Sequence, residues 1–187
     1  MKFKQYLKEE ELLEISIAHA ATFAADAHQG QHRKGSGAPY IVHPRGVYKI
    51  LRQLGVKDRE LLVAAYLHDT IEDSPTTFNQ IKKEFSKNTA NLVKQVTSNK
   101  KTIDKVGKEQ YLLDKMLKMS NNALTLKLAD RLHNVSDIRT ASKSFAEKIW
   151  LQTIFILKNL KKKRNLNTIQ KKLVRLIEKE LQLYREF

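Results

Sequence analysis

The residues best suited to chemistry in this sequence are two histidines and two aspartates that fall in three separate segments. Neutral imidazole combined with carboxylate suits Mn, Fe, Zn and similar divalent ions. The chain contains no cysteine, which excludes a thiolate metal site and a cysteine nucleophile. Any bound metal must therefore be held by histidine and carboxylate. The four candidate ligands are His43, His68, Asp69 and Asp130.

The adjacent pair His68 and Asp69 follows the apolar run LLVAAYL, which predicts that the pair lies where a buried helix meets a cleft. Glu72 and Asp73 come three and four residues after Asp69, so three acids stand close together. Like charges at this spacing repel one another unless a cation or a shifted pKa compensates. In a chain of net charge +15 the cluster indicates a function, and a solvated acidic turn is the alternative.

Asp130 and His43 each have a plainer interpretation as well. Asp130 lies in LKLADRLHN beside an apolar stripe, where a ligand would project, and an ion pair with Lys127 or Arg131 is its alternative. His43 lies in YIVHP, where a loop meets a helix, and a capping or packing role is its alternative. The local sequence leaves both pairs of interpretations open.

The elements that must position these residues are helices. Long segments repeat apolar residues at helical spacing, and the chain has only three prolines and six glycines. The loop at 31–43 is rich in glycine, serine and proline, and its PYIV segment suggests half of one short hairpin near residues 33–43. The sequence predicts an all-α fold in a single domain over residues 1–187. The expected helices cover 10–29, 44–54, 58–68, 75–85, 88–97, 107–119, 123–138, 144–163 and 166–185. The expected apolar stripe of the first helix is Leu12, Ile15, Ala20, Phe23, Ala24 and Ala27.

The net charge of +15 favours anionic partners, which include nucleic acid, a membrane surface and a highly phosphorylated small molecule. Part of the excess lies in KNLKKKRN (158–165) and KKLVR (171–175), where a solvated helix face is the simpler interpretation. No stretch approaches the roughly 18 apolar residues that span a bilayer. The N-terminal segment turns acidic before any long apolar run, so no secretory signal is expected. We expect a cytoplasmic protein without membrane contact, and a homo-oligomer is compatible with the sequence.

The order of the candidate ligands, H…HD…D, is similar to that of the HD phosphohydrolase superfamily. More narrowly, the segments RKGSGAPYIVHP, AAYLHDTIEDSPTT and LKLADRLHNVSDI resemble the hydrolase domain of the RelA/SpoT family. The resemblance covers about residues 15–140, and the basic helices from about 144 to 187 lie outside it. Within that family the chain is most similar to the stand-alone small alarmone hydrolases, often called Mesh1-like.

The resemblance implies a helical HD-domain bundle with one divalent ion, usually Mn²⁺, bound by the four candidate ligands. Glu72 and Asp73 match the family's acidic pair, which positions or deprotonates the attacking water. Arg33 and Lys34 match a loop pair beside the nucleotide base, and Asn134 matches a position near the sugar and phosphates. The implied reaction is hydrolysis of the 3′-pyrophosphate of the guanosine alarmones (p)ppGpp, which gives GDP or GTP and pyrophosphate.

Three other functions remain alternatives at this stage. The same chemistry acts on other nucleotides in HD proteins, for example on the 2′-phosphate of NADPH. A basic nucleic-acid-binding module is a second alternative, but the basic residues are not interleaved with aromatic residues that could stack on bases, so nucleic acid is not the expected partner. A protein that binds metal without turnover is the third.

Overall fold

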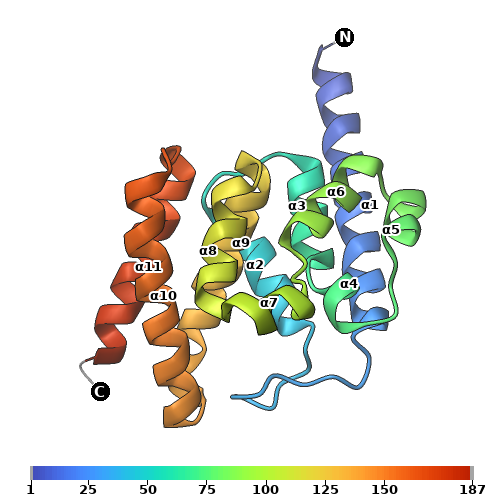
Figure 1. Cartoon of the computed structure of the whole chain (residues 1–187). Helices are drawn as coiled ribbons and strands as arrows, with labels where there is room; N and C mark the ends of the chain where they lie inside the picture. The colour runs from blue at the N-terminus through green and yellow to red at the C-terminus, as the bar shows by residue number, and fades with distance from the viewer. Residues whose placement is uncertain (1, 186–187) are drawn as a thin grey trace. The chain divides into compact units, whose positions relative to one another are not determined.

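The computed structural model describes residues 2–185, and within them the chain is built from helices alone (Figure 1). The β-type pairing in this part of the chain is limited to an isolated antiparallel bridge between His32 and Pro39. The prediction of an all-α fold is confirmed. The helices are α1 (Lys2–Ala27), α2 (Val42–Gln53), α3 (Arg59–Leu67), α4 (Thr70–Asp73), α5 (Phe78–Glu84), α6 (Lys87–Val96), α7 (Lys100–Val106), α8 (Lys108–Lys118), α9 (Asn121–Ser136), the 3₁₀ helix η1 (Ile138–Thr140), α10 (Lys143–Lys163) and α11 (Thr168–Arg185).

The first helix is longer than predicted, and part of its predicted apolar stripe is wrong. α1 begins at Lys2, where residues of good helix propensity precede the buried face. Leu12 and Ile15 are 46% and 58% exposed, whereas Leu13 and Ile17, four residues apart, are buried. The buried face is therefore rotated from the predicted one at this end of the helix.

The loop before α2 also differs from its prediction. The segment PYIV does not form a hairpin strand, because Tyr40 and Ile41 form a turn and Val42 begins α2. Pro44 is therefore the third residue of the helix and not the first. Proline is tolerated there because the N–H groups of the first turn have no partner within the helix.

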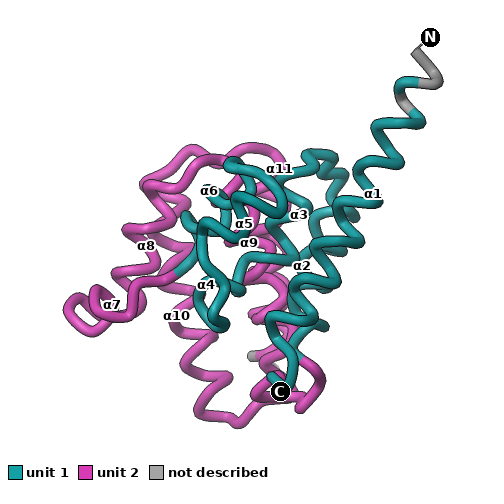
Figure 2. Tube along the Cα trace, turned by 90° about the vertical axis from the view of Figure 1, so that its right-hand side faces the viewer, with its two compact units in different colours: residues 1–31, 40–97 teal, residues 32–39, 98–187 magenta. Residues whose placement is uncertain are grey.

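Residues 1–31 and 40–97 form one compact unit, and residues 32–39 and 98–187 form a second (Figure 2). In the first unit α3 is the innermost helix, since all its residues from Leu61 to Leu67 are buried. Helices α1, α2 and α6 pack against it. A helix that is apolar on every side is stable only when other helices surround it. Because its neighbours surround α3, they fix the position of its C-terminal end.

In the second unit α9 buries apolar side chains along its length from Ala123 to Val135, and α11 packs against it. Arg131 of α9 is buried and donates to the Gln152 side chain of α10 at 2.9 Å. Burial lowers the pKa of the Arg131 guanidinium, and Asp130 and Glu109 oppose that shift through their charges. The division into two compact units does not test whether residues 1–187 form one domain, which stays a prediction.

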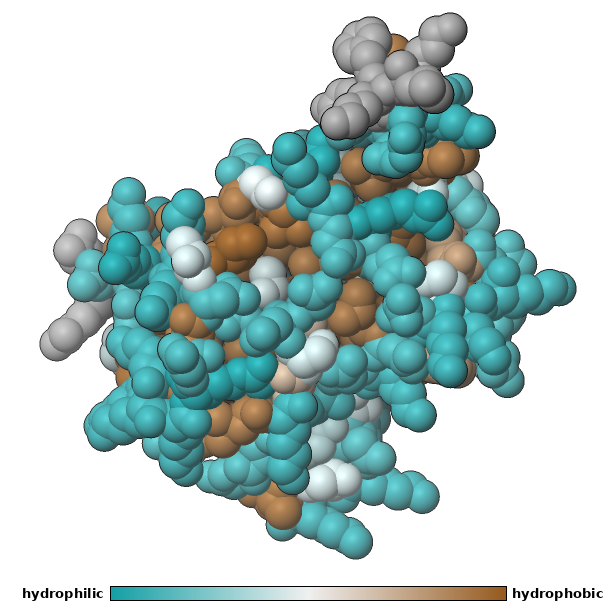
Figure 3. All heavy atoms as spheres, turned by 90° about the horizontal axis from the view of Figure 1, so that it is seen from above, coloured by the Kyte–Doolittle hydropathy of each residue, from teal (hydrophilic) through white to brown (hydrophobic). Residues whose placement is uncertain are grey.

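Within residues 2–185, no helix combines the length and the apolar character that a membrane crossing requires. Figure 3 shows instead that hydrophilic side chains cover much of the face it presents.

Candidate metal centre

His43, His68 and Asp69 meet in the first unit, as the motif predicts for three of the four ligands. His68 caps the C-terminus of α3, Asp69 follows it, and His43 is the second residue of α2. The Nε2 atoms of the two histidines are 3.2 Å apart, and the Oδ2 of Asp69 lies 3.5 Å from the first and 3.1 Å from the second. Both histidines are buried, and the Asp69 side chain is 15% exposed.

The donor set of this cluster fits a divalent ion. Each of the three residues offers one ligand atom, and these atoms all lie within 4.8 Å of one another. Two imidazole nitrogens and a carboxylate oxygen are ligands that Mn²⁺, Fe²⁺ and Zn²⁺ accept. Buried imidazoles that face each other and an acid at such short range are well explained by a cation between them, because polar atoms deep in a protein need a partner.

The orientation of His68 is set by the helix that carries it. Its Nδ1 lies 2.8 Å from the carbonyl oxygen of Ala65, one turn earlier in α3. Since a carbonyl oxygen accepts only, Nδ1 carries a proton and donates, and Nε2 is the ring nitrogen that faces Asp69. Histidine ligands of metals are commonly oriented by such a backbone contact on the other ring nitrogen.

The acidic pair lies one turn further along the chain. The N–H groups of Glu72 and Asp73 donate to the carbonyl oxygen of Asp69 at 3.1 and 2.9 Å, which folds residues 70–73 into the short helix α4. The hydroxyl of Thr70 donates to the carbonyl of Leu67 at 2.8 Å and ties α4 to the end of α3. Glu72 is half-buried, whereas Asp73 is exposed. The structure thus brings both acids into the unit that holds the three metal-ligand candidates.

Asp130, Asn134 and Arg33 form a separate hydrogen-bonded chain in the second unit. The Nδ2 of Asn134 donates to Oδ1 of Asp130 at 2.6 Å, and the Nη2 of Arg33 donates to Oδ1 of Asn134 at 2.9 Å. Arg33 also donates to Oδ2 of Asp137 at 3.0 Å. Lys127 pairs with Oδ2 of Asp130 at 2.8 Å, so the ion pair left open as an alternative is present.

The loop that carries Arg33 lies against η1 in the same unit. The Arg33 N–H donates to the Ala38 carbonyl at 2.8 Å, which closes the loop on itself. A Cβ on Gly35 would lie 2.9 Å from the hydroxyl oxygen of Thr140, so only glycine allows this approach. Lys34 is exposed and lies outside the chain of contacts made by Arg33.

Tyr40 and Asp137, to which no role was assigned from the sequence, contact the candidates directly. The Tyr40 hydroxyl donates to Oδ2 of Asp69 at 2.7 Å, and Asp137 accepts from Arg33 as described. Tyr40 lies three residues before His43, in the segment PYIV, whose composition suggested a strand and not a polar contact. Asp137 lies three residues after Asn134, which is helical spacing and offered a signal.

Residues 20–165 match the family model of the HD domain. A guanosine-3′,5′-bis(diphosphate) 3′-pyrophosphohydrolase, MESH1 of Xenopus tropicalis, is 41% identical over 125 residues, which cover 66% of this chain and 69% of the relative. The bifunctional (p)ppGpp synthase/hydrolase SpoT of Escherichia coli is 34% identical over 177 residues, covering 90% of this chain and 24% of that protein. A solved structure of a metazoan SpoT orthologue that hydrolyses ppGpp has a TM-score of 0.78 at 26% identity, with 90% of this chain and 95% of that chain covered. This chain therefore belongs to the HD-domain family, in the group of guanosine-3′,5′-bis(diphosphate) 3′-pyrophosphohydrolases that includes MESH1.

Proposed function

We propose that this chain is a metal-dependent hydrolase that removes the 3′-pyrophosphate of ppGpp and pppGpp, leaving GDP or GTP. The observation that carries the proposal is the convergence of His43, His68 and Asp69 on one point, in a chain about 40% identical to MESH1 proteins. We propose a cytoplasmic location for this reaction.

One divalent ion would be held by His43, His68, Asp69 and Asp130, and Mn²⁺ is the ion we propose. The place of Asp130 in this set rests on the motif, since it belongs to the second unit. When bound, such an ion neutralises charge on phosphoryl oxygens and lowers the pKa of water.

Glu72 and Asp73 would take the proton from the attacking water. Their backbone N–H groups are anchored on the Asp69 carbonyl, so the acid pair and the ligand segment form one rigid turn. A carboxylate that accepts a proton in the transition state typically contributes about 10²- to 10⁴-fold in rate. Glu72 is the better placed of the two because it is half-buried, where water competes less for its oxygens.

Arg33, Lys34 and Asn134 would bind the nucleotide substrate. The two acceptors on Arg33 restrict the direction of its guanidinium, and we propose that this planar group stacks on the purine base. The side-chain amide of Asn134 donates to Asp130 and accepts from Arg33. We propose that Asn134 orients both groups and also lies near the sugar. Lys34 is exposed and would meet phosphate charge as a point cation.

The variants His68→Ala and Glu72→Gln test the proposal, with pyrophosphate release from ppGpp and Mn²⁺ binding as the two measurements. We expect His68→Ala to lose both, because it removes a ligand. We expect Glu72→Gln to bind Mn²⁺ like the wild type and to lose at least about 10²-fold in kcat, as expected for a missing proton acceptor. The control is His19→Gln on α1, an exposed histidine near Glu84 that should change neither measurement.

Normal turnover by His68→Ala would contradict the metal site. If the wild-type protein leaves ppGpp intact but cleaves another nucleotide, such as NADPH, the proposed hydrolytic chemistry is supported and the proposed substrate is wrong. Full activity of Glu72→Gln would assign the proton of the attacking water to Asp73. In that case Asp73→Asn must lose turnover of ppGpp.

A further inference from the structure

The hydroxyl of Tyr40 donates to the same oxygen of Asp69 that faces the two buried histidines, at 2.7 Å. We propose that Tyr40 is a positioning residue of the ion site, and that His28 and Gln31 hold Tyr40 in place. The inference rests on the ion site of the proposed function and adds a residue to which the motif gave no role.

The contact fixes the direction of the Asp69 carboxylate. A carboxylate oxygen has lone pairs for two partners, so Oδ2 can accept the Tyr40 hydrogen and still face an ion bound by His43 and His68. The Asp69 side chain is 15% exposed, and without the hydroxyl its oxygens would turn toward water. A fixed ligand loses less conformational freedom when the ion binds, which strengthens binding.

The ring of Tyr40 contacts two imidazoles. The His28 ring lies tilted against it with a centroid distance of 4.6 Å, and the His43 ring meets it nearly edge-on at 5.9 Å. The Tyr40 carbonyl also accepts from the N–H of His43 at 2.9 Å. Tyr40 therefore touches two of the three clustered ligand candidates, one through its hydroxyl and one through its ring and backbone.

Gln31 joins this arrangement to the acidic helix. Its Oε1 lies 2.9 Å from Nδ1 of His28, its carbonyl accepts from the Tyr40 N–H at 2.9 Å, and its Nε2 donates to the carbonyl of Asp73 at 2.6 Å. Gln31 thus links the end of α1 to Tyr40 through its backbone carbonyl and to α4 through its side-chain amide. The residue that supports Tyr40 therefore also anchors the turn that carries Glu72.

His28 gives a separate reason to regard these contacts as functional. It is 3% exposed, and its Nε2 is the one buried side-chain nitrogen or oxygen that lacks a hydrogen-bond partner within the described part of the chain. A buried polar atom without a partner costs stability, and an apolar ring would stack on Tyr40 equally well. The imidazole provides what an apolar ring cannot, namely the Nδ1 contact that orients the Gln31 amide.

The test is a titration with Mn²⁺ alone, without nucleotide, followed by calorimetry or electron paramagnetic resonance. We expect Tyr40→Phe to bind Mn²⁺ about 10- to 100-fold more weakly than the wild type, the usual effect of removing a group that orients a metal ligand. The control is Tyr48→Phe, since Tyr48 lies in α2, close to the candidate site in sequence, but stacks on Tyr66 at 5.0 Å. Its Mn²⁺ affinity should be that of the wild type.

Gln31→Ala tests the support of Tyr40. It should weaken Mn²⁺ binding less than Tyr40→Phe does, and the double variant should bind no more weakly than Tyr40→Phe alone, because Gln31 acts through Tyr40. Thermal unfolding in EDTA separates a fold defect from an ion-site defect, since a positioning role predicts normal stability without metal. Should Tyr40→Phe fail to fold, Gln31→Ala and His28→Phe carry the same test.

Unchanged Mn²⁺ affinity in Tyr40→Phe would overturn the role of Tyr40, whatever its activity. Equal losses in Tyr40→Phe and Tyr48→Phe would also overturn it, because the effect would then be general to the unit. If the wild type binds Mn²⁺ but leaves ppGpp intact, the proposed substrate is wrong, whereas the role of Tyr40 is not contradicted.

Discussion

Asn134 links two residues to which the motif gives different tasks. Its amide donates to Asp130, a proposed ion ligand, and its oxygen accepts from Arg33, a proposed base contact. The Lys127 ammonium occupies the other oxygen of Asp130, so both oxygens of that carboxylate have a neighbour that restricts their direction. At the scale of single residues, the order of the second unit's site depends on hydrogen bonds that run along one side of α9 and across to the loop at 32–39.

Asp137 should determine how tightly substrate binds and not how fast it reacts. Its carboxylate accepts a hydrogen bond from Arg33. We propose that Arg33 contacts the base, which is not the part of the substrate that reacts. Asp137→Asn keeps an oxygen acceptor but removes the charge, and a partly exposed ion pair is worth up to about 1 kcal/mol. We expect KM for ppGpp to rise about fivefold with little change in kcat.

The matched control for that prediction is Asp114→Asn on α8, which removes an exposed aspartate bonded to Gln110 and should leave both constants unchanged. A fall in kcat at unchanged KM would show that Asp137 acts on the chemical step and would contradict the assignment of Arg33.

The residue types of the site could be predicted from the sequence, but their contacts could not. His68 and Asp69 are neighbours in the chain, and the fold brings His43 close to both of them. The hydroxyl of Tyr40 and the amide of Gln31 gave no signal, because their roles depend on the turn geometry at 28–43. Single-sequence patterns do not determine which of several polar atoms in a turn meet.

At the scale of elements, the helices with a buried apolar period were the predictable ones, and side-chain caps mark the start of several of them. Asp58 accepts from the N–H of Leu61 at 2.8 Å and begins α3, and Thr77 with Gln80 forms a capping box before α5. Helices α4 and α7 were missed for different reasons. α4 is a single turn held by Asp69, and α7 buries none of its residues, so neither has an apolar period to detect.

The contact between α9 and α10 yields a stability prediction. Gln152 accepts from buried Arg131 and donates to Glu109 at 3.3 Å, so Gln152→Leu leaves a buried charged group short of an acceptor. We expect the free energy of unfolding in urea to fall by about 2–3 kcal/mol. Gln182→Leu, the same change at an exposed position of α11, should stay within about 0.5 kcal/mol. A Gln152→Leu value as small as the control would mean that water or another group satisfies Arg131.

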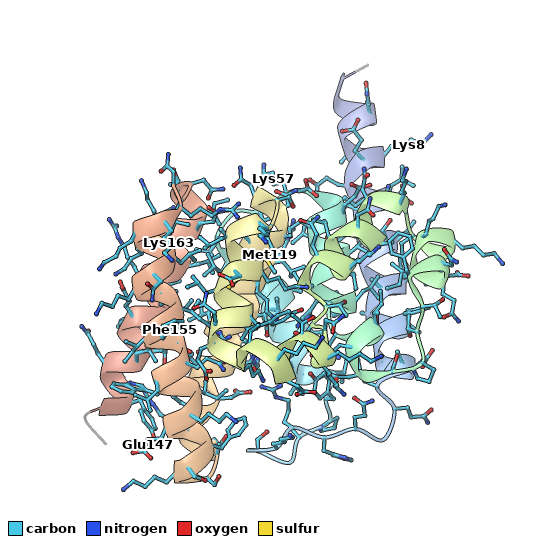
Figure 4. The ribbon with its side chains drawn as sticks, viewed as in Figure 1. Lys8, Lys57, Met119, Glu147, Phe155 and Lys163 are labelled. Carbon is cyan, nitrogen blue, oxygen red and sulfur yellow. The ribbon has the colours of Figure 1, made fainter. Side chains whose placement is uncertain are left out.

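At the scale of the whole molecule, the net charge of +15 is spread very unevenly along the chain. Residues 32–39 and 98–187 carry 23 of the 35 basic residues and 9 of the 20 acidic ones, so the excess belongs almost entirely to the second unit. Residues 158–175, from the end of α10 into α11, hold eight basic residues and no acid, and Lys163 at the end of α10 is labelled in Figure 4. The unit with this field also carries the loop of Arg33 and Lys34.

Such a field should draw a highly anionic nucleotide toward the protein and raise its association rate. We expect kcat/KM for ppGpp to fall as salt rises, while kcat changes little. Replacing Lys162, Lys163, Lys171 and Lys172 by Gln should flatten that dependence, and replacing the same four by Arg should preserve it. Equal salt slopes in the Gln and Arg variants would show that these lysines form a solvated surface without a part in substrate capture.

The measurement that tests the central claim most directly is the identity of the products formed from ppGpp in ¹⁸O-labelled water with Mn²⁺. Attack on the phosphorus attached to the 3′ oxygen forms one P–O bond from water and breaks the bond to the ribose oxygen. We therefore predict GDP and pyrophosphate in equal amounts, with the ¹⁸O in pyrophosphate and neither product from His68→Ala. Release of orthophosphate, ¹⁸O in GDP, or intact ppGpp would contradict the account.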